Sequence, residues 1–250
     1  MESAPFFCFC DKHKEDEMYF DRGELRHIEK VLRLRPGEIV AVFDGSGMEY
    51  RVRLREDQEQ RLKGEIISKA CIDREPETSL HLVQGIAKGD KMDSIVQKAV
   101  EIGVKAIHPL AAQRSVVELD ERKAGKRVMR WQEIAREACK QCRRNQMPLV
   151  NPMRGINEIL QIIGQTPAIM LYEEEHKLGL KQLLQTEEER FTGQEIFILV
   201  GPEGGFSHEE AEAARDRGVH LVTLGPRILR TETAGLVAAS LILYHFNDLG

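Results

Sequence analysis

The chain has 250 residues, of which 36 are Lys or Arg and 41 are Asp or Glu, so its formal net charge is −5 at pH 7. A chain of this length can bury a sizeable core, as one large domain or two, and a hydrophobic fraction of 42% is typical of a soluble globular protein. The net charge excludes a protein that is basic over its whole surface, although a local basic face could still bind nucleic acid.

The cysteines predict neither a disulfide framework nor a metal site. They are five in number, Cys8, Cys10, Cys71, Cys139 and Cys142, and the chain shows no secretory or membrane-spanning segment. We therefore expect free thiols, a reducing cytoplasm, no membrane and no metal. The single C-x-x-C pair lies in a helical pattern, which favours ordinary helix positions over zinc or redox chemistry.

The first part of the chain is β-rich. The expected elements are a short helix at about 23–34 and strands at 39–43, around 50–55 and at 62–72. In the second strand apolar residues alternate with arginines, the period of a strand with one solvated face. These elements predict a small barrel-like domain over residues 1–73. The polar, proline-containing stretch 73–77 has no periodicity and marks the boundary.

The rest of the chain, residues 74–250, alternates between strand-like and helical segments. The expected strands are 79–87, 105–110, 167–173, 195–201 and 219–224, and the expected helices are 90–103, 126–144, 178–187, 207–217 and 233–247. This alternation predicts an α/β domain with a mostly parallel sheet and helices on both faces. Ligands in such domains bind at the carboxyl ends of the strands.

The first unusual loop at such a strand end is 201–205, with the sequence GPEGG. Its three glycines let the backbone approach a ligand closely. The loop lacks the ending of a phosphate loop and the spacing of a dinucleotide-binding loop, and Glu203 would repel phosphate. Ser207 and Glu210 then form a capping box for the next helix. On the glycines alone, a tight strand-to-helix turn is an equally good interpretation.

The second loop begins at Leu224 and carries Arg227 and Arg230 at the mouth of an apolar helix. Capping accounts for the Thr-Glu-Thr sequence at 231–233, because hydroxyl and carboxylate groups satisfy a first helical turn. Cations oppose the helix dipole there, so the arginines indicate a site for an anionic group. Two such loops at neighbouring strand ends favour a shared pocket.

The segment 122–144, which contains the expected helix 126–144, is strongly basic. Only Glu133 and Glu137 oppose nine cations, Arg122, Lys123, Lys126, Arg127, Arg130, Arg136, Lys140, Arg143 and Arg144. A buried stripe is expected at Val128, Trp131, Ala135, Ala138 and Cys142. A solvated face is the usual alternative for such a run. On an acidic protein the local surplus favours a face that contacts RNA phosphates, which arginines of the first domain, Arg33, Arg35, Arg51, Arg53 and Arg55, are expected to extend.

The two loops carry a resemblance. LVGPEGGFS (199–207) paired with LGPRILRTETA (224–234) resembles the bacterial small-subunit ribosomal RNA uracil-N3 methyltransferases of the knotted SPOUT superfamily. His27 with VLRLRPG (31–37), KGDKMDSIVQKAVEIGVKAIHPL (88–110), QRS (113–115) and WQEIAREACKQCRR (131–144) with Pro148 are similar to that family too. The resemblance covers nearly the whole chain in order.

The resemblance implies a PUA-like β-barrel followed by a SPOUT methyltransferase domain with a deep C-terminal trefoil knot. It implies a homodimer that uses S-adenosylmethionine to methylate N3 of uracil 1498 in 16S ribosomal RNA of the small subunit. The implied cofactor-binding residues are Leu171, Tyr172, Glu173, Gly201, Pro202, Glu203, Gly204, Gly205, Leu224, Gly225, Ile228, Leu229, Arg230, Thr231, Thr233 and Ala234. Candidate RNA-binding residues are His27, Arg33, Lys88, Arg114, Arg127, Arg130, Lys140 and Arg143.

Methyl transfer to uracil N3 would require mostly positioning of the two reactants and no metal. The base must be unpaired or flipped, because N3 lies on its Watson–Crick edge. Arg230 is the candidate for stabilising the developing uracil oxyanion, and Glu232 is a weaker candidate for the base. The alternatives are that Arg230 only binds phosphate and that Glu232 only caps the helix.

Two other functions remain open at this point. One keeps the fold but changes the target to another position in ribosomal or transfer RNA, which the N-terminal barrel with His27 disfavours. The other is a non-catalytic RNA-binding assembly factor, which an intact pair of cofactor loops disfavours.

Overall fold

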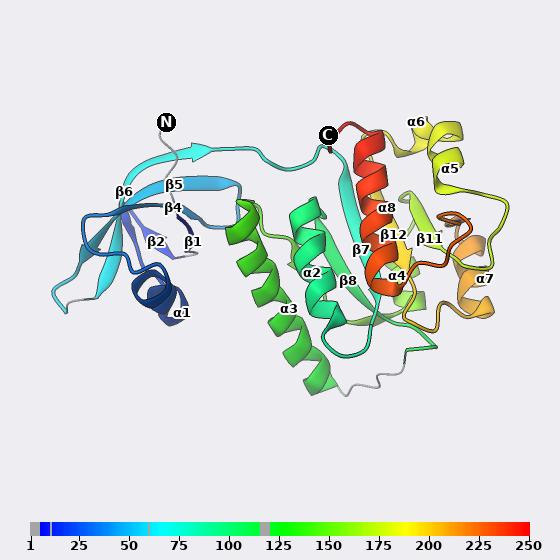
Figure 1. Cartoon of the computed structure of the whole chain (residues 1–250), viewed down its shortest axis with the longest axis horizontal. Coiled ribbons are helices and arrows are strands. Elements are labelled where there is room, and N and C mark those ends of the chain that lie inside the picture. The colour runs from blue at the N-terminus through cyan, green and yellow to red at the C-terminus, as the bar shows by residue number, and fades with distance from the viewer. Residues whose placement is uncertain (1–5, 11, 60, 116–120) are drawn as a thin grey trace. The chain divides into compact units, whose positions relative to one another are not determined.

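The computed structural model describes residues 6–10, 12–59, 61–115 and 121–250. The chain divides into two compact units. The first consists of residues 1–75 and 136–147, and the second of residues 76–135 and 148–250. Each unit has its own sheet and its own core (Figure 1).

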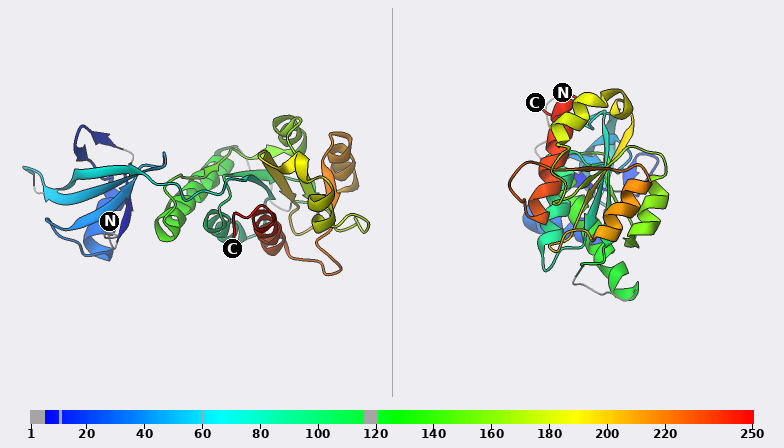
Figure 2. Two further views of the ribbon diagram at one scale, coloured as in Figure 1. Left: turned by 90° about the horizontal axis from the view of Figure 1, so that it is seen from above. Right: turned by 90° about the vertical axis from the view of Figure 1, so that its right-hand side faces the viewer.

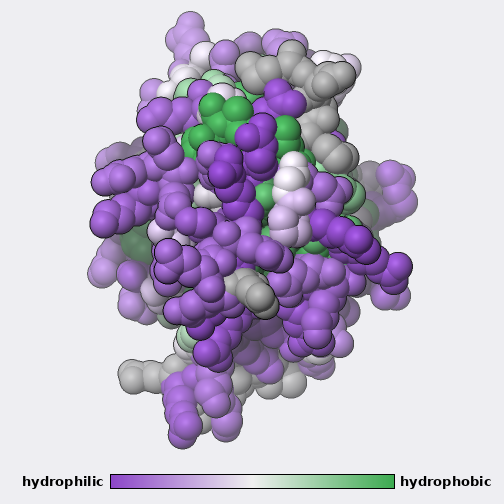
Figure 3. Space-filling model, turned by 90° about the vertical axis from the view of Figure 1, so that its left-hand side faces the viewer, coloured by the Kyte–Doolittle hydropathy of each residue, from purple (hydrophilic) through white to green (hydrophobic). Residues whose placement is uncertain are grey.

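The first unit is built on a six-stranded sheet with the order β1-β4-β5-β6-β3-β2. Its elements are β1 (Phe7–Phe9), β2 (His13–Lys14), β3 (Glu17–Met18), α1 (Arg22–Arg26), the π-helical turn η1 (His27–Val31), β4 (Ile39–Phe43), β5 (Met48–Glu56) and β6 (Leu62–Cys71). The predicted alternation in β5 is confirmed, since Tyr50, Val52 and Leu54 are buried in the core. On the other face, Arg53 and Arg55 both pair with Glu65. The face of this unit that Figure 3 shows is mostly hydrophilic.

The C-terminal part of the long helix α3 (Glu121–Cys142) belongs to this first unit. There the Lys140 ammonium is buried, 2.9 Å from Glu24 Oε2 and 2.9 Å from Glu137 Oε1. Arg136 pairs with Asp21 at 3.3 Å and Arg144 pairs with Glu75. The expectation that Lys140 contacts RNA is therefore corrected, because its charge is already neutralised inside the fold.

The second unit contains a sheet with the order β10-β8-β7-β12-β11-β13, and β9 pairs with β8. Every strand pair described in it is parallel, as predicted. The strands are β7 (Ser79–Gly85), β8 (Ala106–Ala111), β9 (Leu149–Val150), β10 (Arg154–Gly155), β11 (Ala168–Leu171), β12 (Glu195–Val200) and β13 (His220–Val222). The helices besides α3 are α2 (Lys91–Ile102), α4 (Ile156–Ile163), α5 (Leu180–Thr186), α6 (Glu188–Phe191), α7 (His208–Asp216) and α8 (Thr231–His245).

The helices of this unit cover both faces of the sheet (Figure 2). Helices α2 and α8 pack together on one face, and α8 lies against β7 and β12. On the other face, α4 and α7 enclose a core with Val83, Phe197 and Leu199. Helix α8 is apolar almost all round, which is the pattern of a helix that is covered on more than one side. Within the described residues, no helix is both long and apolar enough to cross a membrane.

Two histidines, His81 in β7 and His108 in β8, lie beside Phe197 in the core of the second unit. His81 Nδ1 and His108 Nε2 are 3.1 Å apart, and both rings contact Phe197. Burial lowers the pKa of His108 to about 4, helped by the neighbouring His81 and Arg154. Burial also lowers the pKa of His81, although Glu195 opposes this shift. The fold therefore favours the neutral form of both rings.

We expect this pair to make stability fall in mild acid. An unfolded histidine has a pKa of about 6.5, so between that pH and about 4 the unfolded chain binds more protons than the native one. The His108 contribution is present above this window and is lost as pH falls through it, up to roughly 3 kcal/mol. Urea unfolding at pH 7.5 and 5 measures the loss. His108→Leu should reduce the difference in unfolding free energy between the two pH values, and His176→Leu, at an exposed position, should not. An equal difference in both variants would contradict the assignment.

Candidate functional site

A cavity of about 350 Å³ lies at the carboxyl ends of three adjacent strands, β12, β11 and β13. Its walls are the segments that follow these strands, together with the start of α8. All predicted cofactor residues except Gly204 and Thr233 line it. The two loops that the sequence singled out are thus brought together around one space, of the size of a small-molecule site.

The two exceptions point elsewhere. A Cβ on Gly204 would lie 3.0 Å from Arg114 Cβ, so this position faces Arg114 and not the cavity. Thr233 is exposed in the first turn of α8. The lining also includes the candidate base Glu232 and six residues that the sequence did not single out as cofactor contacts, namely Lys91, Val200, Phe206, Val222, Thr223 and Arg227.

Buried hydrogen bonds fix the two walls to each other. Thr231 Oγ1 donates to the Gly201 carbonyl at 2.6 Å and accepts from Gln84 Nε2 at 2.8 Å. Gln84 lies in β7 and is fully buried. The next residue, Gly85, leaves no space for a side chain, because a Cβ there would lie 2.4 Å from Pro202 N. The glycine-rich loop and the start of α8 are therefore held against the end of β7.

The charged residues of the cavity are organised by Lys91, the first residue of α2. Its Nζ lies 3.0 Å from Glu203 Oε1 and 3.4 Å from Glu232 Oε2. Glu203 Oε1 also accepts a hydrogen bond from the Lys88 backbone N–H at 3.1 Å. The pKa of Lys91 is raised, chiefly by its hydrogen bond to Glu203. Lys91 follows β7, so its place at a strand end was the available signal, but only Lys88 was singled out there.

Arg230 is the N-cap residue of α8 and has an extended backbone. Its side chain is 83% exposed, and its Nη1 lies 4.0 Å from Glu232 Oε1. The backbone N–H of Glu232 donates a hydrogen bond to the Glu232 carboxylate and holds its pKa low, and Lys91 lowers that pKa further. Glu232 is consequently ionised at neutral pH and a weak proton acceptor, whereas Arg230 presents its donors at the cavity.

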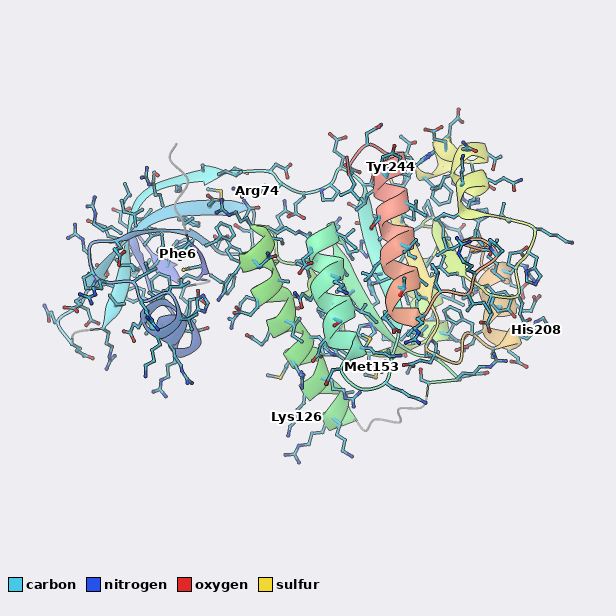
Figure 4. All side chains as sticks on the ribbon, in the orientation of Figure 1. Phe6, Arg74, Lys126, Met153, His208 and Tyr244 are labelled. Atoms are coloured by element: carbon cyan, nitrogen blue, oxygen red, sulfur yellow. The ribbon has the colours of Figure 1, made fainter. Side chains whose placement is uncertain are left out.

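The predicted RNA-contact residues are spread over both units. In the second unit, Arg114 Nη1 donates to the Gly204 carbonyl at 3.2 Å, and the exposed Arg130 pairs with Asp93. Lys88 is exposed and Arg127 is half-buried. In the first unit, Arg33 and Arg143 are exposed with left-handed φ values of 58° and 64°, and His27 is half-buried. At the start of α3, Lys126 points away from the helix (Figure 4).

The cavity suits an organic ligand with an apolar body. Leu224, Leu229 and the 80% exposed Ile228 supply apolar surface, and the glycine loop supplies backbone groups. Three carboxylates in the lining, Glu173, Glu203 and Glu232, disfavour a polyphosphate. Among the residues that the structure describes, no cluster of three or more metal-ligating side chains is found.

A parallel α/β sheet with a loop-built cavity at its carboxyl edge is the arrangement in which proteins of this fold class bind small organic ligands. Family models agree on a more specific class. The RNA methyltransferase domain matches residues 74–243, and the RNA methyltransferase PUA domain matches residues 20–67. The chain belongs to the RNA methyltransferase family, and its fold is an α/β methyltransferase fold with an N-terminal PUA-like domain.

Individual relatives match over nearly their whole length. Ribosomal RNA small subunit methyltransferase E of Bacillus subtilis is 34% identical over 88% of this chain and 87% of its own. The protein of that name from Neisseria gonorrhoeae, solved bound to S-adenosylmethionine, superposes with a TM-score of 0.84 at 34% identity, covering 95% of this chain and 96% of its own. A Legionella pneumophila methyltransferase solved with bound cofactor SAM gives a TM-score of 0.85 at 28% identity, covering 98% of both chains.

Proposed function

We propose that this protein transfers a methyl group from S-adenosylmethionine to N3 of a specific uridine, uracil 1498, in 16S ribosomal RNA. The observation that carries the proposal is the cavity in which the glycine-rich loop and the Arg230 loop meet. Relatives named as small-subunit methyltransferases, one of them solved with the cofactor, support the substrate and the donor. We propose the cytoplasm as its compartment, because its proposed substrate is 16S ribosomal RNA.

Some residues of the cavity would bind the methyl donor, S-adenosylmethionine, and others would stabilise the methyl acceptor, uracil. Backbone groups of 201–205 and the apolar residues Leu224, Ile228 and Leu229 would hold the adenosine part. When bound, S-adenosylmethionine supplies an electrophilic methyl group. As the uracil N3 proton passes to solvent water, negative charge develops on the carbonyl oxygens of the base, and the Arg230 guanidinium is the exposed donor that would stabilise it. The low pKa of Glu232 favours a structural role for that carboxylate.

Nucleoside analysis tests the proposed reaction. Ribosomal RNA from a strain that lacks the gene should lose 3-methyluridine from 16S RNA, and the wild-type gene should restore it. Purified protein, labelled S-adenosylmethionine and either free 16S RNA or small subunits from that strain should give the same nucleoside. A different methylated nucleoside would change the substrate, and no methylation of either RNA would reject the proposal.

RNA contact is assigned to the N-terminal half of α3. Lys126→Ala with Arg127→Ala should reduce the log–log salt slope of RNA binding by roughly 1.4–1.8, the sum for two lost phosphate contacts. Lys177→Ala with Lys181→Ala removes the same charge from exposed positions around α5 and should leave the slope unchanged. Filter binding between low and physiological salt measures both slopes. Equal slopes for the two variants would show that this half of α3 is a solvated face that does not contact RNA.

The domain boundary and the knot are part of the proposal. We place the PUA-like domain at 1–73 and a SPOUT domain at 74–250, with the C-terminal segment forming a deep trefoil knot. The family-model matches at 20–67 and 74–243 support the boundary, although residues 136–147 pack within the first compact unit, and the path of the C-terminal segment supports the knot. The chain runs to the edge strand β13, passes through the 223–230 loop at the cavity, and returns as α8 against β12 and β7.

A homodimer is proposed for the same protein, with the substrate site completed by the second copy. The support comes from α8, whose sequence is apolar almost all round and which leaves Leu241 and Tyr244 47% and 68% exposed. Tyr244 lies at the surface near the C-terminal end of that helix (Figure 4). Leu241 and Tyr244 are three residues apart and so lie on one face of the helix, where a contiguous exposed apolar patch is the mark of a protein interface.

A further inference from the structure

Four charged side chains of alternating sign form a row along the cavity: Glu203, Lys91, Glu232 and Arg230. Lys91 Nζ joins the two carboxylates at 3.0 and 3.4 Å, and Glu232 Oε1 lies 4.0 Å from Arg230 Nη1. The four residues come from three segments that are distant in sequence: the loop after β12, the first turn of α2 and the start of α8. The row thus links the glycine-rich wall to the proposed catalytic arginine.

Local structure does not explain Lys91. A cation in the first turn of a helix opposes the helix dipole. Its partner Glu232, in contrast, requires a nearby cation. Oε2 of Glu232 is shielded from solvent and has no hydrogen-bond partner among the described residues. The nearby Lys91 ammonium is the cation that compensates the charge on that oxygen.

Glu232 therefore stands between two cations that compete for it. Its Oε2 faces Lys91 and its Oε1 faces Arg230, at the longer distance of 4.0 Å. Without Lys91, the Arg230 guanidinium becomes the cation that can compensate this carboxylate, and a close arginine–carboxylate pair uses two donors at once. Arg230 would then offer fewer donors to a substrate.

We propose that Lys91 is a positioning residue that holds Glu232 back, so that Arg230 stays exposed and available. The role of Arg230 toward the substrate rests on the proposed function. The competition for Glu232 does not, and it can be measured on the protein alone. Glu203 supplies the matched control, because it also binds Lys91 and no contact joins it to Arg230 in the described structure.

The direct test is the rate at which phenylglyoxal modifies Arg230, followed on its peptide by mass spectrometry in the full-length protein. Lys91→Met should slow modification roughly three- to fivefold, the population shift that a partly exposed ion pair can cause. Adding Glu232→Gln should restore the rate, whereas adding Glu203→Gln should not. Lys91→Arg keeps the charge and should behave as the wild type. An unchanged rate in folded Lys91→Met, or equal restoration by both second changes, would overturn the inference.

Methyl transfer should follow the same order among these variants, in kcat more than in KM for either substrate. If the wild type does not methylate RNA but the modification rates follow the expected order, the proposed function fails and the role of Lys91 stands. If the wild type methylates 16S RNA and the modification rates do not differ, the inference about Lys91 fails alone.

Discussion

Arg230→Ala is expected to lower the turnover of methyl transfer by roughly 10²–10³, the usual loss when one donor to a developing oxyanion is removed. The side chain is 83% exposed and is not needed to hold the fold. Cofactor binding should change little, because the adenosine part would be held mainly by backbone groups of 201–205 and by the apolar residues Leu224, Ile228 and Leu229. The effect should therefore fall on kcat at saturating RNA and S-adenosylmethionine.

Single-turnover assays at saturating RNA separate this role from simple attraction of phosphate. Arg227→Ala is the matched control, because Arg227 is in the same loop, lines the same cavity and carries the same charge. A general electrostatic effect would slow both variants alike and would disappear at high RNA concentration. Full activity of Arg230→Ala at saturating RNA would remove Arg230 from the mechanism.

The strands and most helices of the second unit could be predicted because their patterns are local. Apolar runs at 79–87 and 195–201 correspond to β7 and β12 within a few residues. Helix α8 begins at Thr231, two residues before the expected start, because Arg230 and not Glu232 is its N-cap. Helix α4 was not predicted. Its apolar sequence INEILQII has only eight residues, and a segment of that length does not show whether the apolar residues follow the period of a helix or of a strand.

The basic helix shows where sequence patterns fail. Spacing alone placed Cys142 on the buried stripe, but Cys139 is fully buried and Cys142 is only half-buried. The last part of α3 packs within the first unit, a contact between distant segments that helix spacing does not encode. Lys140 was counted as a surface cation for the same reason, since its partner Glu24 lies 116 residues away in sequence.

The loops of the candidate site could be predicted from the sequence, but the contacts that join them to other segments could not. Glycines and arginines at strand ends mark 201–205 and 224–230 without any knowledge of the fold. Lys91 and Gln84 gain their roles because β7 is the sheet neighbour of β12, a pairing of strands that do not follow each other in the chain. Such a neighbour relation is set by the folded sheet, so no local pattern reveals it.

The second large effect concerns the cofactor loop: Gly205→Val is expected to abolish the rise in Tm that S-adenosylmethionine causes. For the wild type, a cofactor concentration of a hundred times Kd stabilises the folded state by about 2.7 kcal/mol, or roughly 5–10 °C at this chain length. Gly205 lines the cavity and has φ +68°, where a β-branched residue is strained. Its Cβ would also lie 3.1 Å from Glu173 Oε1, so that carboxylate on the facing wall of the cavity would have to shift.

The neighbouring Gly204→Val distinguishes damage to the cavity from damage to the loop. Gly204 lies outside the lining, is not left-handed, and would direct its Cβ toward Arg114 at 3.0 Å. Both variants should melt below the wild type without cofactor, because each adds a side chain to a tight turn. Only Gly204→Val should keep most of the cofactor-dependent rise, measured by differential scanning fluorimetry across a cofactor titration. A full rise in folded Gly205→Val would show that the cofactor does not bind against this wall, since a valine there cannot coexist with a ligand in contact with the Gly205 backbone.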